Sequence, residues 1–353
     1  MGKVGTIYSL KALRLSMKIC YFIEHSLHYI PIILPLIQKT GGTIISQVKN
    51  TEKCLKHKPV NFDILYYKNE NRLLSAFRNL PFEIIVHPGF SIELFRKVPG
   101  LKHVQIFHGT SDKPYNYDKT LQYYDLIIAP GPLMKEEIIN RNLAEEKKIK
   151  ITGYPKIDAF LHSEFDTQSF RKNLGFNKDK KVILYAPTWN DPERYSSFRK
   201  YIIPLLRDLK EYYLIVKPHA NILRDRPWQL LKAYLKKERN TVIFPKAASI
   251  LPFMAVSDML ITDISSVSHE YLTFDKPMIF LCPKQKESIP EEHIWIFQCG
   301  DIIERERNIL TTVQANFEHP DRYRKHREYA LKRIFYKFDG KSPDRFMQAL
   351  TEL

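Results

Sequence analysis

The chain has 353 residues and a mass of 41.7 kDa, which suits two ordinary domains or one large domain. Hydrophobic residues make up 44% and charged residues 27%, so the composition is that of a globular protein and excludes disorder as the main state. Lysine and arginine exceed the acidic residues by 55 to 39. This excess favours a polyanionic partner, such as nucleic acid, an anionic membrane or a phosphate-rich substrate, but a plain solubility effect explains it equally well.

The cysteines and the N-terminus indicate a reducing compartment. The four cysteines lie far apart with no CxxC pair, so we expect free thiols and no thiolate zinc site. The first apolar stretch is interrupted at Glu24 and His25 and does not resemble a signal peptide. The apolar run 30–37 is shorter than the roughly 20 residues that span a bilayer. We therefore expect any contact with a membrane to be peripheral.

Apolar runs typical of buried strands alternate with amphipathic stretches typical of helices. In chain order up to residue 152, the predicted strands are 18–24, 43–48, 62–67, 83–87, 104–108, 126–129 and 150–152. The helices predicted between them are 31–38, 70–80, 92–98 and 133–143. The stretch 153–175 is a plausible crossing point, after which the alternation restarts. The later predicted strands are 181–186, 212–217, 242–244, 259–262 and 278–281. The later predicted helices are 198–209, 228–237, 249–256, 267–274, 320–335 and 344–350.

This alternation predicts an α/β protein with two doubly wound, Rossmann-like domains. We place the N-terminal domain at residues 1–160 and the C-terminal domain at 161–353, with the last helices able to cross back. In such sheets ligands bind beyond the carboxyl ends of the strands. Chemistry should therefore be sought in the residues that directly follow each predicted strand.

Five polar segments follow predicted strands. His108-Gly109-Thr110 could approach an oxyanion through the glycine backbone, although an ordinary tight turn explains the triplet alone as well. The segment 153–158 (GYPKID) contains Gly153, Pro155 and Asp158 and could equally be a solvated linker. The segment 185–191 (YAPTWND) offers the Thr188 hydroxyl to a phosphate and ends in Asp191.

The other two segments suit phosphate more directly. Lys217 and His219 put a cation and an imidazole two residues apart, which fits a diphosphate or a surface pair. Asp263, Ser265 and Ser266 stand where a helix begins, so hydroxyls and free backbone amides could meet an anion, and plain capping is compatible with that use. GxGxxG, P-loop, HExxH and GxSxG signatures are missing from the sequence.

Together these segments resemble the CDP-glycerol glycerophosphotransferase family of teichoic-acid and capsule synthesis. The motifs that carry the resemblance occur in the family's order and are HGT at 108–110, GYPKID at 153–158, ILYAPTWND at 183–191, KPH at 217–219, LITDISS at 260–266 and KPMIF at 276–280, with DGK at 339–341 near the end. The family's usual aromatic in the fifth motif is Ile264 here, its usual arginine in the third is Asn190, and HGT continues as SDKPY. The first hundred residues match only in architecture.

The resemblance implies a GT-B-like fold, with two Rossmann-like domains facing across a cleft. It implies transfer of glycerol phosphate, or a related alditol phosphate, from a CDP-alditol to a hydroxyl of a lipid-linked, prenyl-diphosphate saccharide acceptor, with release of CMP. His108 then resembles the general base and His219, with Lys217, the ligand of the leaving diphosphate. The residues that resemble donor or phosphate ligands are Gly109, Thr110, Thr188, Asp263, Ser265 and Ser266. The positioning residues are Gly153, Pro155, Asp158 and Asp191.

The resemblance also implies partners and a location. We expect no tightly bound cofactor and no protein metal site, although a loosely held magnesium ion could accompany the donor. We expect a cytoplasmic protein, peripheral on the inner face of the cell membrane and bound to its anionic surface. The basic segments that could serve this contact are Lys3, Lys11, Arg14 and Lys18, and Arg322–Lys325 with Arg327. The length mildly favours a primer or short-chain enzyme over a polymerase.

Three other functions stay open. A GT-B glycosyltransferase that uses a nucleotide sugar would share the diphosphate site, and a sugar-nucleotide epimerase would share the architecture. A nucleic-acid-binding protein would suit the charge, but the aromatic residues lie mostly in core-like runs, so we expect no nucleic acid. The sequence does not indicate the alditol, the acceptor or the oligomeric state.

Overall fold

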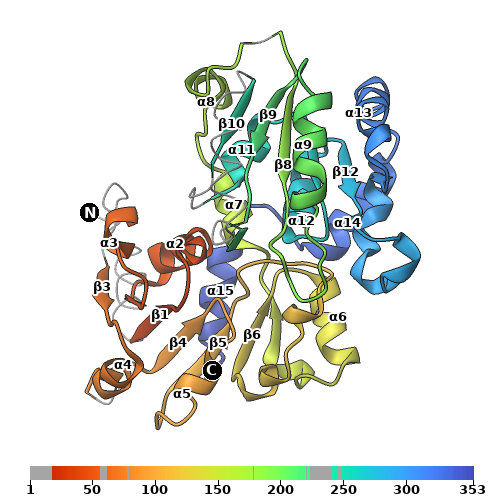
Figure 1. Cartoon of the computed structure of the whole chain (residues 1–353). Coiled ribbons are helices and arrows are strands. Elements are labelled where there is room, and N and C mark those ends of the chain that lie inside the picture. Colours follow the sequence, from red (N-terminus) through yellow and green to blue (C-terminus); the bar gives the residue numbers. More distant parts are fainter. Residues whose placement is uncertain are drawn as a thin grey trace, which may run out of the picture. The chain divides into compact units, whose positions relative to one another are not determined.

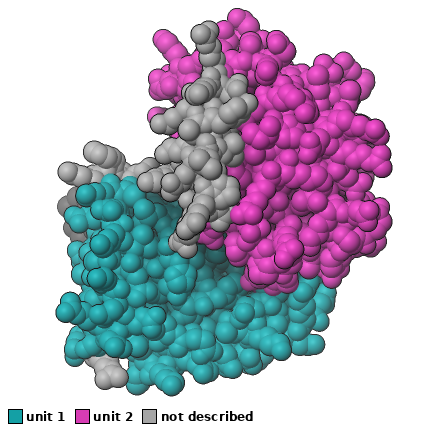
Figure 2. Space-filling view, in the orientation of Figure 1, with its two compact units in different colours: residues 1–108, 117–163, 335–353 teal, residues 109–116, 164–334 magenta. Residues whose placement is uncertain are grey.

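The computed structural model describes residues 18–55, 62–77, 79–177, 179–219, 221–222, 240–244 and 249–353. The helix predicted at 228–237 lies outside these residues. The chain forms two compact units, coloured separately in Figure 2. Unit 1 contains residues 1–108, 117–163 and 335–353, and unit 2 contains residues 109–116 and 164–334. This division differs from the boundary predicted at residue 160 in placing 109–116 with unit 2, while 335–353, where the last helices were expected to be able to cross back, groups with unit 1.

Unit 1 is built on a seven-stranded sheet in the order β3-β2-β1-β4-β5-β6-β7 (Figure 1). Its strands are β1 Ile19–Ile23, β2 Thr43–Ser46, β3 Asp63–Tyr66, β4 Ile84–His87, β5 Lys102–Gln105, β6 Leu126–Ala129 and β7 Ile149–Ile151. Every neighbouring pair is parallel. The apolar strands β1, β4 and β6 are buried along their whole length, as a parallel sheet covered on both faces requires.

The helices of unit 1 connect these strands. They are α2 Ile30–Thr40, α3 Thr51–Leu55, α4 Glu70–Phe77, α5 Ile92–Phe95, α6 Pro132–Asn140, α7 Pro155–Leu161 and α15 Ser342–Leu350. Helix α2 has a proline in its first turn and stops at Gly41, whose φ of 72° suits a residue without a Cβ. Helices α2, α7 and α15 pack against one another, which attaches the C-terminal end of the chain to unit 1.

Unit 2 is built on a six-stranded sheet in the order β10-β9-β8-β11-β12-β13, again with every pair parallel. Its strands are β8 Val182–Ala186, β9 Tyr213–Val216, β10 Thr241–Ile243, β11 Met259–Thr262, β12 Met278–Leu281 and β13 Asp301–Ile303. Its helices are α8 Thr167–Asn173, α9 Phe198–Asp208, α11 Leu251–Val256, α12 Ser266–Tyr271, α13 Ile309–Glu318 and α14 Arg324–Ile334. Apolar side chains of α9 and α13 cover one face of the sheet, and α11 and α12 contact β8 and β11 (Figure 1).

Most predicted elements are present with small shifts at their ends. The bounds predicted for β6, β11 and β12 agree with the structure. The strand predicted at 104–108 is instead Lys102–Gln105, so His108 lies three residues beyond it. The sequence analysis missed α3, α7, α8, β13 and α13. Four of these are seven residues or fewer, and such short elements depend on tertiary contacts more than on local preference.

Both sheets share one topological feature that matters for function. The strand order reverses between β1 and β4 in unit 1, and between β8 and β11 in unit 2. In doubly wound sheets, connections leave such a pair of strands in opposite directions and open a crevice at their carboxyl ends, where ligands bind. We therefore expect ligand-binding residues at the carboxyl ends of β1 and β4 and of β8 and β11.

Candidate active site

His108 is held at the carboxyl edge of the unit 1 sheet by the turn after β4. Its backbone N–H donates to the carbonyl oxygen of Pro88 at 3.0 Å, and its ring Nδ1 lies 2.7 Å from the same oxygen. Because a carbonyl oxygen only accepts hydrogen bonds, Nδ1 must carry the proton. In the neutral ring the lone pair is then on Nε2. The geometry thus prepares Nε2 to accept a proton.

The surroundings of His108 favour its neutral form. The rings of His28 and Tyr29, which follow β1, lie with their centroids 4.9 Å from the centroid of the His108 ring. Burial lowers the pKa of His108, the hydrogen bond to Pro88 opposes this, and the positive charge of Lys156 lowers the pKa further. An imidazole with a lowered pKa is unprotonated at neutral pH and can act as a base.

The turn before His108 is strained and is supported by a residue that the sequence analysis missed. Phe107 has a φ of 43°, a left-handed conformation that is costly for a residue with a bulky side chain. The Gln105 side-chain oxygen accepts hydrogen bonds from the backbone N–H groups of Ile106 and Phe107, at 3.0 and 3.2 Å. Its nitrogen donates to the Gly89 carbonyl at 3.1 Å. The sequence carries no signal for this role, because the contacts of Gln105 can be recognised only once the path of the backbone is known.

In unit 2, Asp263 links the loops that follow β8 and β11. Its buried carboxylate accepts hydrogen bonds from the Thr188 backbone N–H at 2.8 Å, the Ser197 backbone N–H at 2.8 Å and the Ser197 hydroxyl at 2.7 Å. Burial raises the pKa of Asp263 to about 6, against the opposing effect of these hydrogen bonds and of the positive charge of Lys113. Asp263 thus fixes Thr188 beside the start of α12, where Ser265 and Ser266 lie.

The two serines form the N-terminus of α12. Ser265 is the cap residue, and its hydroxyl accepts a hydrogen bond from the Val267 backbone N–H at 3.4 Å. Ser266 opens the helix, and both side chains are partly exposed. Gly109 lies directly against Ser266, because a Cβ on Gly109 would stand 3.4 Å from the Ser266 Cβ and Oγ. The structure therefore brings Gly109, Thr188, Asp263 and the two serines together within unit 2.

Lys217 and His219 follow β9, the strand that neighbours β8. His219 is partly buried, and its Nδ1 accepts a hydrogen bond from the Asn221 backbone N–H at 3.2 Å. Because Nδ1 accepts, the neutral ring carries its proton on Nε2 and can donate from there. Its ring centroid lies 6.4 Å from that of Trp189, on the loop after β8. Lys217 and His219 therefore lie at the same edge of the unit 2 sheet as Thr188.

The segment after HGT contains contacts that the sequence analysis missed. The Thr110 hydroxyl lies 3.1 Å from Nδ1 of His269 on α12. Nε2 of the same His269 ring lies 3.0 Å from an Asp112 carboxylate oxygen. Lys113 is buried and pairs with Asp191. The sequence analysis treated SDKPY only as a departure from the family pattern, because a buried lysine has no sequence signature of its own.

The GYPKID and DGK motifs meet within unit 1. Asp158 is fully buried, and its carboxylate accepts from the backbone N–H groups of Gly340 and Ser342, at 2.8 and 2.9 Å. Gly153 has a φ of 87°, and a Cβ there would stand 3.2 Å from the Lys337 carbonyl oxygen. Pro155 opens α7. These contacts attach the segment before α15 to the region where α7 begins.

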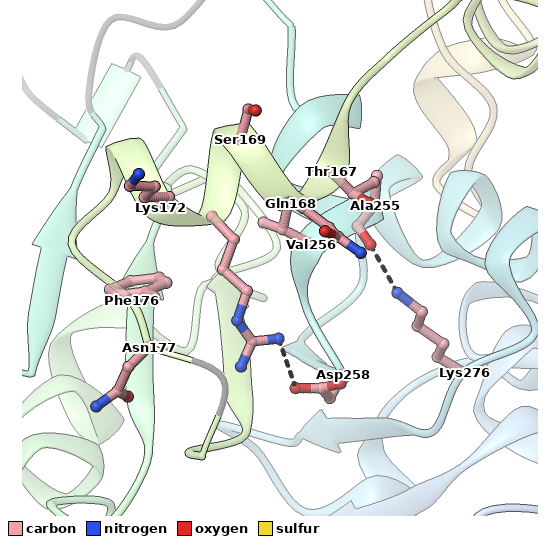
Figure 3. A pocket seen from close by; sticks show the side chains of 11 residues that line it. Thr167, Gln168, Ser169, Lys172, Phe176, Asn177, Ala255, Val256, Asp258 and Lys276 are labelled. Carbon is pink, nitrogen blue, oxygen red and sulfur yellow. Dashed lines mark hydrogen bonds and ion pairs between the residues drawn. The ribbon is translucent and has the colours of Figure 1, made fainter.

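The lysine of the KPMIF motif lies at the opposite edge of the unit 2 sheet. The Lys276 ammonium donates to the carbonyl oxygen of Ala255 at 2.8 Å, near the end of α11 (Figure 3). It also donates to the carbonyl oxygen of Ser257 at 2.5 Å. It lines a cavity of about 760 Å³, together with Asp258 and residues of α8. Because Asp258 precedes β11 and Lys276 precedes β12, this cavity is at the amino ends of the strands. Lys276 is therefore not one of the polar residues that gather at the carboxyl ends of the strands.

The basic surface predicted at Arg322–Lys325 with Arg327 includes one residue that is buried, so the prediction is wrong for Arg327. Arg327 is 2% exposed, and its Nε donates to an Asp275 carboxylate oxygen at 2.9 Å. Arg322 and Arg324 are exposed and pair with acidic residues. Lys3, Lys11 and Arg14 lie outside the described residues.

Two features are absent from the residues that the structure describes. Within the part of the chain that the structure describes, no three His, Cys, Asp or Glu side chains are grouped so that they could hold a metal ion. Among the same residues, no helix is both long enough and apolar enough to cross a membrane.

Comparison with known proteins first defines the class. The structure of a variant of the wall teichoic acid polymerase TagF superimposes with a TM-score of 0.71 at 18% identity, covering 95% of this chain and 88% of the other. A form of TagF soaked with CDPG gives 0.72 at the same identity and coverage. The UDP-GlcNAc 2-epimerase of Neisseria meningitidis, bound to UDP-GlcNAc, gives 0.66 at 16% identity and covers 96% and 100%. The fold is thus GT-B-like, with two Rossmann-like units.

The family follows from the sequence match. A family model described as CDP-Glycerol:Poly(glycerophosphate) glycerophosphotransferase matches residues 77–352. The chain belongs to this family, and the resemblance seen in the motifs is confirmed. The matched range includes all the motifs from HGT to DGK.

The individual relatives carry different names, which describe a polymerase, a primase and a transferase. The teichoic acid poly(glycerol phosphate) polymerase of Bacillus spizizenii is 33% identical over 189 residues, which is 50% of this chain and 45% of the polymerase. The teichoic acid ribitol-phosphate primase of the same organism is 28% identical over 202 residues (55% and 51%). The teichoic acid glycerol-phosphate transferase of Staphylococcus aureus is 27% identical over 215 residues (52% and 53%). The chain therefore spans about half the length of these relatives.

Proposed function

We propose that this protein transfers an alditol phosphate, glycerol phosphate in the first instance, from a CDP-alditol to a hydroxyl of a lipid-linked acceptor in teichoic-acid or capsule polymer synthesis. The observation that carries the proposal is that the HGT, YAPTWND, KPH and LITDISS motifs follow strands, at the carboxyl edges of the two sheets. His108 lies at that edge of unit 1, and Thr188, His219, Ser265 and Ser266 lie at that edge of unit 2. Family membership supports the proposal that these positions serve phosphate transfer.

The proposed reaction is a displacement at phosphorus. The acceptor hydroxyl loses its proton to Nε2 of His108, and its oxygen forms a bond to the β-phosphorus of the CDP-alditol. The bond between that phosphorus and the bridging oxygen breaks, and CMP leaves with the electron pair. In such reactions positioning and charge stabilisation supply most of the rate enhancement.

Residues of unit 2 would hold the donor. The hydroxyls of Thr188, Ser265 and Ser266 and the backbone of Gly109 and Thr110 can donate to phosphate oxygens. Lys217 brings a positive charge, and Nε2 of His219 can donate a hydrogen bond, so this pair suits the charge that develops on the leaving CMP. No tightly bound cofactor enters the proposal, and a magnesium ion would arrive with the donor.

The decisive experiment measures CMP release from CDP-glycerol and CDP-ribitol in parallel, with and without a prenyl-diphosphate-linked saccharide acceptor. UDP-GlcNAc is included as a donor for the glycosyltransferase and epimerase alternatives, and each reaction is run with magnesium and with EDTA. Acceptor-dependent CMP from one CDP-alditol supports the proposal and identifies the donor. UDP release, or conversion of UDP-GlcNAc without acceptor, would overturn it.

A lipid-linked acceptor requires contact with a membrane, and we propose that this contact is peripheral and on the cytoplasmic face. The formal charge of +16 supports attraction to an anionic surface. Flotation with vesicles that contain anionic lipid should recover the protein at low salt and lose it as salt rises. Equal recovery with neutral vesicles would contradict an electrostatic contact.

A further inference from the structure

The segment directly after His108 belongs to unit 2. Residues 109–116 group with residues 164–334, although residues up to His108 and from Tyr117 onward belong to unit 1. Three of its side chains, on Thr110, Asp112 and Lys113, contact unit 2. An eight-residue segment with this many specific contacts is fixed by them and is not a simple connection.

Lys113 makes the shortest of these contacts. Its ammonium lies 2.5 Å from an Asp191 carboxylate oxygen and donates to the Thr188 hydroxyl at 2.8 Å. The lysine is 5% exposed and Asp191 is 2% exposed. The other carboxylate oxygen of Asp191 accepts from the Tyr195 backbone N–H at 2.8 Å. A buried lysine is costly unless it is paired, so this geometry indicates a built contact.

A second contact fixes the segment from the side of α12. The Asp112 carboxylate lies 3.0 Å from Nε2 of His269, and its other oxygen accepts from the Ile296 backbone N–H at 2.9 Å. Thr110 reaches Nδ1 of the same histidine. These contacts hold Gly109 against Ser266, the first residue of α12.

Lys113 therefore acts on the residues to which we assign the donor phosphates. It contacts the hydroxyl of Thr188, while Asp263 accepts from the backbone N–H of the same residue. The two contacts together fix both the backbone and the side chain of Thr188. Loss of the first would free the hydroxyl to rotate and would loosen the segment that carries Gly109.

We propose that Lys113 is a positioning residue of the donor site: through Asp191 and Thr188 it holds segment 109–116 against the strand-end loops of unit 2. This inference rests on the proposed function for the identity of the donor. It assigns the segment after HGT to the donor site in unit 2, whereas the sequence analysis placed this segment in the N-terminal domain. It also gives SDKPY a role that its departure from the family pattern did not suggest.

The test compares two variants that each remove one buried cation from unit 2. Lys113→Met removes the proposed anchor. Arg327→Met is the matched control, because Arg327, which is 2% exposed, is also buried and paired, but its partner Asp275 lies beyond α12, before β12. Two quantities are measured, namely amide hydrogen exchange of the ligand-free proteins and the Kd for CDP-glycerol. The wild type is measured beside them.

We expect Lys113→Met to speed exchange in segments 109–116 and 187–197 by about tenfold or more, and to weaken CDP-glycerol binding by a similar factor. Arg327→Met should speed exchange around α14 instead and leave the Kd within about twofold of the wild type. If Lys113→Met does not fold, the double variant Lys113→Met with Asp191→Asn, which leaves no unpaired buried charge, is measured by the same criteria.

Unchanged exchange in 109–116 overturns the anchoring, whatever the donor is. Faster exchange with an unchanged Kd overturns the donor role. Equal weakening of binding by Arg327→Met would show that general destabilisation is the cause and would also overturn it. Absence of binding of both CDP-glycerol and CDP-ribitol by the wild type would overturn the proposed function and the donor role together, while exchange would still decide the anchoring.

Discussion

The carboxyl group of Asp263 should make the stability of unit 2 depend on pH, and replacing it with asparagine should remove that dependence. Burial raises its pKa from the ordinary value of 3.8 to about 6. Below pH 3.8 the group is protonated in both the folded and the unfolded protein. Above that pH the unfolded chain releases the proton while the folded protein keeps it, so unfolding becomes more favourable as pH rises.

The magnitude follows from the difference between the two pKa values. A gap from 3.8 to about 6 corresponds to about 3 kcal/mol of stability, lost between these two pH values and constant above the higher one. The group is fully buried, so solvent screens it little. Lys113 faces the carboxylate and limits the shift, and Tyr185 beside it has a raised pKa and stays neutral in this range.

The assay is urea unfolding of the wild type and Asp263→Asn at several pH values from 4 to 7.5. All three tryptophans lie in residues 164–334, so tryptophan fluorescence reports on unit 2. Other carboxyl groups titrate in both proteins, and the difference between them isolates Asp263. We expect the free energy of unfolding of the wild type to fall relative to that of the variant by about 2 kcal/mol between pH 4 and 6.5, because the rest of the change lies mostly below pH 4.

A constant offset between the two proteins across this range would refute the reasoning. The variant also loses hydrogen bonds to Thr188 and Ser197, and that loss sets the size of the offset but not its change with pH. A difference that grows in the other direction would mean that the hydrogen bonds and Lys113 outweigh burial. The sign of the slope thus decides which effect dominates.

Three further predictions follow from other parts of the site. His108→Ala should lower kcat by about a hundredfold or more while CDP-glycerol still binds, and in the wild type kcat/KM should fall only below pH 6.5, because the pKa of His108 is lowered. A near-normal rate in the folded variant would rule out His108 as the base. Gly153→Ala should lower the free energy of unfolding by about 2 kcal/mol, because of its positive φ and the nearby Lys337 carbonyl, and an unchanged melting temperature would contradict this. Asp158→Ala should cost about 3 kcal/mol and speed hydrogen exchange in α15, because two backbone N–H groups before and at the start of that helix lose their acceptor; exchange that stays slow would count against this role.

The sequence was sufficient for the architecture because its signals are local. Strands such as β11 and β12 are continuous apolar runs between turn residues, and they were predicted to the residue. The ordered motifs at strand ends were enough to predict the family, because each depends on residue type and spacing. The short elements α7 and β13 escaped, since few of their residues carry a periodic signal.

The partners of the charged and strained residues were decided only by the tertiary structure. Lys113 and Arg327 look like ordinary surface cations in the sequence, and only the fold shows them buried against Asp191 and Asp275. The tautomer of His108 depends on the Pro88 carbonyl, twenty residues away in the chain. Burial and ion pairing depend on which distant segments the fold brings together, and for that reason composition and spacing could propose the site's residues but not their partners.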